Sequence, residues 1–339
     1  MYDVDNKSIL FNKGGTLILQ SLQTSNTKSK TNDNNNHDIN NNNQYYQTSP
    51  LTLQQTKQCL RTIAKFHATA FQNSNILYKV SQKLCTYGGS YHLKNRNPKE
   101  LMNIKHTWNE FLNHLRNGND NGDGVNDNNG ISMDILERED IQNIGIRIFN
   151  IAEYVSNELS PLYNDDYATI VHGDFKAMNI FLPMNNDDDD DDNSQSSRQP
   201  LLIDFASTGV GIGLSDVAMI ITHAVHPDEL NKNNNAKDEE EKLIMTYLEA
   251  LRNALPPSKR RLYSNDVAMR HYRLATIDYF RFILGRIWRG ATLETFEKKK
   301  HSKNAVLVSR NVDAALAFID RVDRYLVDIE KEVQLKGNK

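Results

Sequence analysis

The sequence predicts an α+β fold in which a few short strands lead into a largely helical carboxyl half. Two short apolar runs, 168–171 and 201–203, are bounded by polar loops, which is typical of buried strands. Longer segments at 141–159, 265–289 and 304–333 repeat apolar residues with the period of a helix. At 339 residues the chain is long enough for one large domain or two lobes.

The amino-terminal segment contains a predicted hairpin and then a polar stretch. Strand-like runs at 7–11 and 16–19 flank a turn at 12–15 that contains two glycines. Residues 23–50 are mostly Asn, Gln, Ser and Thr, so they bury too little apolar surface to offset ordering, and we expect a disordered insertion. Residues 117–130 and 184–200 share this composition. The first of these resembles a calcium loop, but Gly130 stands where such a loop needs Glu, so we reject a calcium site.

We expect residues 51–333 to form a helical carboxyl lobe with its own core. Thr52 begins a helix with Gln55 as its capping-box partner, and the apolar face of this helix includes His67. Because His67 lies on that apolar stripe, we interpret it as a packed structural histidine rather than a ligand. Further helices are expected at 141–159, 216–225, 242–255, 265–289 and 304–333, with an acidic linker near 228–241.

Three polar side chains follow the two central strands. Asp174 comes after the strand at 168–171, Asn179 follows it by five positions, and Asp204 ends the second strand. Transfer of a phosphoryl group to a hydroxyl needs a proton acceptor, and Mg²⁺ needs a few hard oxygen ligands. In the kinase arrangement Asp174 would be the base, and Asn179 and Asp204 the metal ligands. A metallophosphoesterase would need Asp-x-His upstream and Asn-His downstream, and neither occurs.

The amino-acid sequence of this region resembles that of a known group of enzymes. His-Gly-Asp-x-x-x-x-Asn at 172–179, Ile-Asp-Phe at 203–205 and Ser-Asp-Val-Ala at 215–218 are similar to the aminoglycoside phosphotransferase group. Within it, the sequence most resembles the choline-kinase-like and ecdysteroid-kinase-like (CHK kinase-like) small-molecule kinases. The resemblance is strong across 167–225, fair across 14–75 and 140–166, and topological elsewhere. It implies a protein-kinase-like fold, ATP and Mg²⁺ as cofactors, and a small-molecule hydroxyl as acceptor.

The resemblance also implies roles for residues around the catalytic loop. Asp216 would open a helix and hold the loop by its backbone amides, and His172 would support the loop as a scaffold residue. Lys176, two positions after Asp174, would steady the transferred phosphoryl group and is counted with it as catalytic.

The nucleotide would bind beside the hinge between the lobes. The strand at 16–22 leads into that hinge in the family, so backbone groups of Gln20, Ser21 and Leu22 would face the adenine. Relatives often carry a carboxylate at the position of Gln20, and backbone contacts make this difference tolerable.

The amino lobe of a kinase is largely missing. Such a lobe has a Gly-rich phosphate loop and a strand Lys paired with a helix Glu. No such loop is present, and Lys7 and Lys13 lie on the wrong strands by order. We therefore expect a truncated amino lobe, with 1–22 as its remnant. Two interpretations stay open: an active kinase whose lobe was lost in delimiting the chain, and a catalytically silent pseudokinase that acts as a binding or regulatory module.

The triad of Asp174, Asn179 and Asp204 favours the active enzyme, whereas the absent lysine and phosphate loop speak against robust activity of this chain alone. The acceptor stays open among choline-like cations, sterols and aminoglycosides. Aromatic residues in the segment 76–116, which helps to form the acceptor pocket in the family, are interpreted as core residues rather than substrate contacts; they are Tyr87, Tyr91 and Trp108.

Composition limits the partners and the compartment. The formal net charge of −3 offers no basic field, so we expect no nucleic acid as a partner. Cys59 and Cys85 cannot build a disulfide framework, and we expect both to be reduced in a cytoplasmic protein. No apolar run of 18 residues and no signal peptide occur, so no membrane association is expected.

Overall fold

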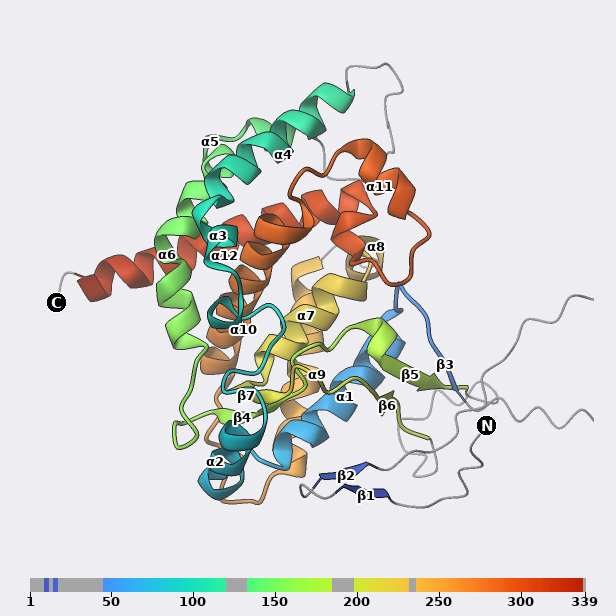
Figure 1. Ribbon diagram of the computed structural model, residues 1–339, viewed down its shortest axis with the longest axis vertical. Coiled ribbons are helices and arrows are strands. Elements are labelled where there is room, and N and C mark those ends of the chain that lie inside the picture. Colours follow the sequence, from blue (N-terminus) through green and yellow to red (C-terminus); the bar gives the residue numbers. More distant parts are fainter. Residues whose placement is uncertain are drawn as a thin grey trace, which may run out of the picture. The chain divides into compact units, whose positions relative to one another are not determined.

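The computed structural model describes residues 45–119, 133–184, 198–231 and 236–337, together with two short strands near the amino terminus. The chain forms two compact units. The first comprises Met1–Gln47 and Phe181–Leu201, and the second comprises Thr48–Ile180 and Leu202–Lys339. Figure 1 shows the helices and strands of both units. The predicted nucleotide contacts Gln20, Ser21 and Leu22 lie outside the described residues, as do most of the predicted insertions at 117–130 and 184–200.

The first unit contains small antiparallel sheets. β1 (Ile9–Phe11) pairs with β2 (Gly15–Leu17), so that Ile9 lies opposite Leu17, which confirms the predicted hairpin. β3 (Tyr45–Tyr46) pairs with β5 (Ile180–Pro183) in a sheet with the strand order β3-β5-β6, where β6 is Leu201–Leu202. The predicted disordered insertion therefore extends too far, because residues 45 and 46 form a strand and Ser49 is buried.

The second unit is almost entirely helical. Its long helices are α1 (Leu53–Ala68), α2 (Ser74–Lys83), α4 (Ile104–Asn119), α6 (Ile144–Glu158), α7 (Leu214–Ala224), α9 (Ala236–Ala254), α10 (Asn265–Phe282) and α12 (Val312–Gly337). Shorter helical elements are η1 (Leu93–Asn95), α3 (Pro98–Met102), η2 (Met133–Glu137), α5 (Glu139–Gln142), η3 (Ala177–Asn179), α8 (Pro227–Asn231), η4 (Ile283–Ile287), α11 (Leu293–Lys299) and η5 (Leu307–Ser309). Helices with small sheets fit the predicted α+β class.

α7 is the central helix of this unit. Ten of its eleven residues are buried and most of these are apolar, as expected of a helix enclosed by others. It contacts α1 and α10 (Figure 1), and α1 in turn packs along α9. A second packing layer joins α4, α10 and α12 through aromatic rings, in which Phe111 stacks on Trp288 at 4.4 Å and Phe280 meets both tryptophans edge-on. The core thus surrounds α7 and continues to α12.

α1 forms because its local sequence supplies both a start signal and a buried face. The Thr52 hydroxyl accepts a hydrogen bond from the Gln55 amide, and the Gln55 side chain accepts one from the Thr52 amide, which is the predicted capping box. Leu60, Ile63 and His67 recur at helical spacing and are fully buried. The prediction of this helix is confirmed.

A two-stranded sheet carries the polar residues of the motif. β4 (Ala168–Val171) pairs antiparallel with β7 (Gly209–Ile212), with Val171 opposite Gly209. α2 packs against both strands and helps to enclose Ala168 and Val210 in a small apolar cluster. The predicted strand at 168–171 is confirmed, and the run 201–203 contributes the two residues of β6.

Predictions for one linker and two helices need correction. The segment near 228–241 predicted as an acidic linker forms α8 and the first turns of α9, in which Glu240 is buried and paired with Arg321. The helix predicted for 265–289 ends at Phe282 and widens into a π turn, where Gly285 packs so closely on Glu100 that a Cβ would lie 3.0 Å from its carbonyl oxygen. The last helix begins at Val312 rather than 304, after α11 and η5.

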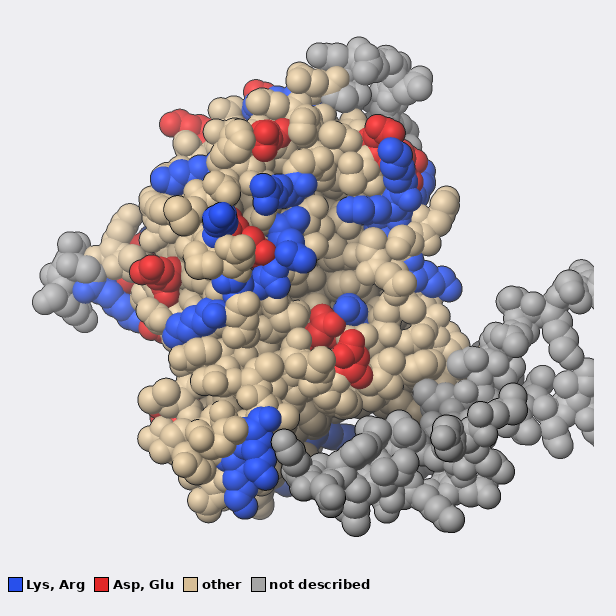
Figure 2. Space-filling model, in the orientation of Figure 1, with Lys and Arg blue, Asp and Glu red and all other residues tan. Residues whose placement is uncertain are grey.

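Among the described residues, no helix combines the length and apolar character that crossing a membrane requires. Cys59 and Cys85 are both free thiols, the first buried and the second half-buried. On the face shown in Figure 2, basic and acidic side chains lie among one another, in line with a net charge close to zero.

Candidate active site

The polar loop at the end of β4 is held in an unusual backbone conformation. Gly173 has φ of +81°, a region that side chains rarely adopt, and a Cβ there would lie 2.1 Å from the carbonyl oxygen of Ser207. The carbonyl of Gly173 accepts a hydrogen bond from the Ser90 amide at 2.8 Å. The glycine therefore lets three chain segments approach one another directly before Asp174.

Asp216, in the first turn of α7, holds this loop through hydrogen bonds from two backbone amides. Its Oδ2 accepts a hydrogen bond from the His172 amide at 2.7 Å, and its Oδ1 accepts one from the Gly173 amide at 2.9 Å. The carboxylate is 1% exposed, and such charge-assisted bonds from backbone amides are strong in a dry environment. The family resemblance implies this role for Asp216, which is to hold the loop by its backbone amides.

His67 links the same carboxylate to α9. Its Nε2 donates to Asp216 Oδ2 at 3.0 Å, so its Nδ1 is left to accept the hydroxyl proton of Tyr247 at 2.9 Å. Gly213 provides the space for this network, because a Cβ there would lie 2.2 Å from the Tyr247 hydroxyl. His67 is thus a buried structural residue, as its place on the apolar stripe indicated, and it also orients Asp216.

His172 is fully engaged by the backbone. Its Nε2 donates to the Ile203 carbonyl at 2.9 Å, and its Nδ1 accepts from the Asp174 amide at 3.3 Å. Both ring nitrogens are used and the tautomer is set by these partners. This leaves no lone pair for proton transfer, which fits a supporting role for His172 rather than that of a base.

The Asp174 carboxylate collects three donors. Lys176 Nζ lies 2.7 Å from Oδ2, Asn179 Nδ2 lies 3.1 Å from the same oxygen, and the Ser90 hydroxyl lies 3.3 Å from Oδ1. The side chains of Asp174 and Lys176 are 17% and 29% exposed. The carboxylate is therefore oriented by these donors yet still open on one side.

Asn179 and Asp204 are brought together by the backbone. The Ile203 amide donates to the Asn179 carbonyl at 3.0 Å, so the residue that follows, Asp204, lies beside Asn179. Asn179 Nδ2 donates to the carbonyl and the carboxylate of Asp174, which orients its Oδ1 away from that residue. Asp204 is exposed and has φ of +63°, a conformation that is uncommon for non-glycine residues and is adopted more often by Asp and Asn than by others.

These two side chains are suitable ligands for a hard cation. Asn179 Oδ1 has no protein partner among the described residues, and neither does the Asp204 carboxylate. Within the described chain, no cluster of three or more His, Cys, Asp or Glu side chains could hold a metal ion. Two protein oxygens with an open side fit Mg²⁺, which usually keeps water and phosphate oxygens as its other ligands.

The charged side chains of the loop influence the pKa of His223 in the C-terminal half of α7. Burial, and after it the positive charge of Lys176, lowers the pKa of His223 to about 3. His223 is therefore neutral inside the core at physiological pH. Tyr279 on α10 responds in the opposite direction, because burial and then the negative charge of Asp174 raise the pKa of its hydroxyl. Both side chains are buried, so the groups that the loop charges act on lie in a water-poor core.

Sequence reasoning missed Ser90 and the His67–Tyr247 pair. The nearest signal for Ser90 is the Gly88-Gly89 dipeptide before it, since a Cβ on Gly88 would lie 2.2 Å from Val171. The aromatic residues interpreted as core are mostly that: Tyr91 and Trp108 are buried and bond to backbone carbonyls, and Tyr87 is half-buried.

One of three comparisons with known proteins found a match. Residues 43–257 match the model of the ecdysteroid kinase-like family. Searches of curated proteins and of solved structures found no significant match. The matched segment spans more than half of the chain and includes α1, the loop that carries Asp174, the Asp204 turn and α7, so it confirms the resemblance and supports a kinase-like fold. The chain belongs to the ecdysteroid kinase-like family, a family of kinase-like transferases.

Proposed function

We propose that this protein transfers the γ-phosphoryl group of ATP to a hydroxyl of a small molecule in a Mg²⁺-dependent reaction. The observation that carries the proposal is the set of groups around Asp174: a half-open carboxylate on a loop that Asp216 holds by two backbone amides. Membership of a kinase-like family supports the reaction class. The products would be ADP and a phosphate monoester.

Asp174 serves as the base. A hydroxyl that approaches the open side of its carboxylate can pass its proton to Oδ1, which carries only the long 3.3 Å contact from Ser90. Oδ2 is occupied by Lys176 and Asn179 at 2.7 and 3.1 Å, so it orients the carboxylate instead of accepting the proton. The ring of His172 cannot take this part because both its nitrogens are bonded.

Lys176 has a second task beyond orienting the base. Its ammonium group is partly exposed beside Asp174, so it can also meet the negative charge that gathers on the transferred phosphoryl group. Asn179 Oδ1 and the Asp204 carboxylate serve as the metal ligands. The bound metal ion would neutralise phosphate charge and align the phosphoryl group with the acceptor.

Other parts of the proposal rest on the sequence alone. Backbone groups of Gln20, Ser21 and Leu22 are assigned to the adenine, and these residues lie outside the described chain. The cytoplasm is the expected location, since both free thiols fit a reducing compartment.

The test measures ADP formation with Mg²⁺, ATP and a panel of choline, sterol and aminoglycoside alcohols. Asp174→Asn should reduce transfer by about 10²-fold or more, since a positioned base contributes about that much. It should leave nucleotide binding by calorimetry unchanged. Asp166→Asn, a matched change at an exposed position, should behave as wild type. Lys176→Ala should lose turnover and keep nucleotide binding.

Two results would contradict the proposal. Equal rates for wild type and Asp174→Asn would remove Asp174 as the base. Binding of ATP without transfer to any acceptor would instead support the catalytically silent binding module.

A further inference from the structure

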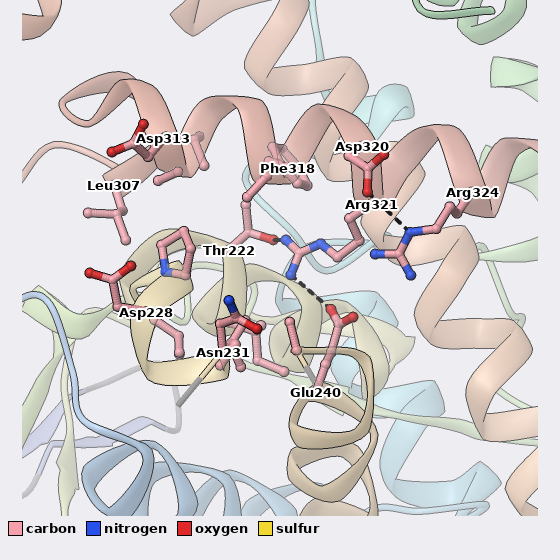
Figure 3. A pocket seen from close by; sticks show the side chains of 18 residues that line it. Thr222, Asp228, Asn231, Glu240, Leu307, Asp313, Phe318, Asp320, Arg321 and Arg324 are labelled. Atoms are coloured by element: carbon pink, nitrogen blue, oxygen red, sulfur yellow. Dashed lines mark hydrogen bonds and ion pairs between the residues drawn. The ribbon is translucent and has the colours of Figure 1, made fainter. Parts of the chain in front are cut away.

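A cavity of about 380 Å³ lies in the helical unit (Figure 3). Its walls come from the end of α7, from α8, from the first turns of α9, from η5 and from α12. None of the described residues that line it belongs to the segment 172–179. The volume falls in the range of small-molecule sites, which is roughly 300–1,000 Å³.

The cavity is a groove along α12 with an apolar middle. Asp313, Ala317 and Arg321 are spaced four residues apart and Arg324 follows, so they share one face of the helix over about 16 Å. Between the charged ends, the walls combine the polar Thr222 and Asn231 with apolar side chains, which include Ile221, Val225, Leu307, Val308 and Phe318. Phe318 is the single aromatic residue among the described residues of the lining, so these residues form no cage for a quaternary ammonium group.

The arginines at one end are already paired. Arg321 donates to Glu240 at 2.8 Å and to the Thr222 hydroxyl at 2.7 Å, and Figure 3 shows its guanidinium between these two partners. Arg324 lies 3.5 Å from Asp320. An anionic ligand would have to compete with Glu240 for Arg321, and breaking this buried ion pair is costly. At Arg324, which is 45% exposed, it would compete with Asp320.

The other end carries negative charge with little compensation. Figure 3 shows Asp228 and Asp313 at this end, near Leu307. Asp228 has His226 beside it at 3.3 Å, and Asp313 has no ion pair or hydrogen bond of its side chain among the described residues. Among the described residues that line the cavity, four carboxylates face two guanidinium groups, a formal charge of −2. The lining therefore attracts a cation and repels an anion.

We propose that this cavity binds a small amphipathic amine, with its apolar body along α12 and its ammonium group at the Asp228 and Asp313 end. The N–H groups of a primary or secondary amine can donate to the carboxylates. The aliphatic walls remove the apolar body from water. This site is separate from the phosphoryl-transfer site and does not depend on that function.

Three probes with the same ten-carbon chain test the class of ligand. Decylammonium, decanol and decanesulfonate differ only in the head group, and calorimetry measures their binding to the full chain. Decylammonium should bind with one-to-one stoichiometry and at least about 3-fold more tightly than decanol, as two partly exposed carboxylates would provide. Decanesulfonate should bind most weakly. Equal affinity for all three probes, or tighter binding of the sulfonate, would overturn the proposal.

Variants place the binding at this cavity. Ala317→Leu fills the groove from α12 and should abolish decylammonium binding, whereas Ala254→Leu at an exposed position should not. Asp313→Asn should weaken decylammonium by about 2- to 5-fold and leave decanol unchanged. Asp266→Asn is the matched control, because Asp266 is the second residue of α10 as Asp313 is of α12.

The same variants also define the results that would contradict the proposal. Unchanged binding in Ala317→Leu would show that the amine binds elsewhere. Asp228→Asn is a second charge variant that should fold, since its side chain is 79% exposed, and its affinity for decylammonium should also fall. If neither aspartate variant weakened the amine, the assignment of its ammonium group would be wrong.

Discussion

Replacing Asp216 by Asn tests the support of the catalytic-type loop. The change keeps the size of the side chain and converts one carboxylate oxygen into an NH₂ group. Oδ2 accepts two hydrogen bonds, from His67 Nε2 and the His172 amide, whereas Oδ1 accepts one, from the Gly173 amide. The amide oxygen will therefore take the Oδ2 position, and the new NH₂ group will face the N–H of Gly173.

This arrangement sets the size of the effect. One charge-assisted hydrogen bond is lost and a buried backbone donor is left without an acceptor, because Asp216 is 1% exposed and water does not reach it. The two remaining bonds lose the full negative charge of their acceptor. Together these changes should lower the free energy of unfolding by about 2–3 kcal/mol. A typical domain is stable by about 5–15 kcal/mol, so the variant should still fold.

Urea unfolding followed by tryptophan fluorescence measures this loss. Trp108 and Trp288 are both fully buried in the core that α7 joins, so they report on the helical unit. Asp266→Asn makes the same change at an exposed position in the first turn of α10 and should stay within about 0.5 kcal/mol of wild type. A midpoint for Asp216→Asn equal to that of wild type would refute the account of this network.

Two further changes test neighbouring parts of the structure. Gly173→Ala should lower thermal stability and displace the loop, because its φ is +81° and the new methyl group would meet the Ser207 carbonyl oxygen at 2.1 Å; a melting temperature equal to wild type would contradict this. Burial lowers the pKa of His271 to about 4, so only the unfolded chain takes up its proton near pH 6.5. Stability should therefore fall as pH drops from about 6.5 to about 4, with a contribution of about 1.4 kcal/mol per pH unit from His271. Urea midpoints between pH 7 and 5 should depend less on pH in His271→Gln, but not in His301→Gln, which changes an exposed side chain; an unchanged slope in His271→Gln would count against the assignment.

The long helices were predictable because their signals are local. Thr52 and Gln55 are three residues apart, and the apolar residues of α1, α6 and α12 repeat with the helical period over four or more turns. The short elements were not predictable in this way. α11 has seven residues, too few for a clear period, and the π turn at 283–287 follows from the close packing of Gly285 on Glu100.

In the candidate site too, some residues were predictable from local sequence and others were not. Asp174, Asn179 and Asp204 stand out because each follows an apolar strand at a spacing that phosphoryl transfer requires, and the structure brings them to one loop region. Ser90 is 84 residues from Asp174, and its contact with that carboxylate depends on how the segment before it runs beside β7, where Cys85 forms a parallel bridge with Gly209. The Gly88-Gly89 dipeptide permits this close approach but does not specify which strand the segment pairs with.

The sequence by itself therefore determined the family, the α+β class, the main helices and the polar residues of the loop. These properties depend on residues close to one another along the chain. Only the tertiary structure decided which buried groups support the loop, as in the bond between His67 and Asp216, which are 149 residues apart. It also decided that α7 and α12 enclose a cavity with acidic and ion-paired ends. The physical reason is that buried polar groups must find partners after the helices pack, and the identity of those partners follows from packing rather than from local sequence.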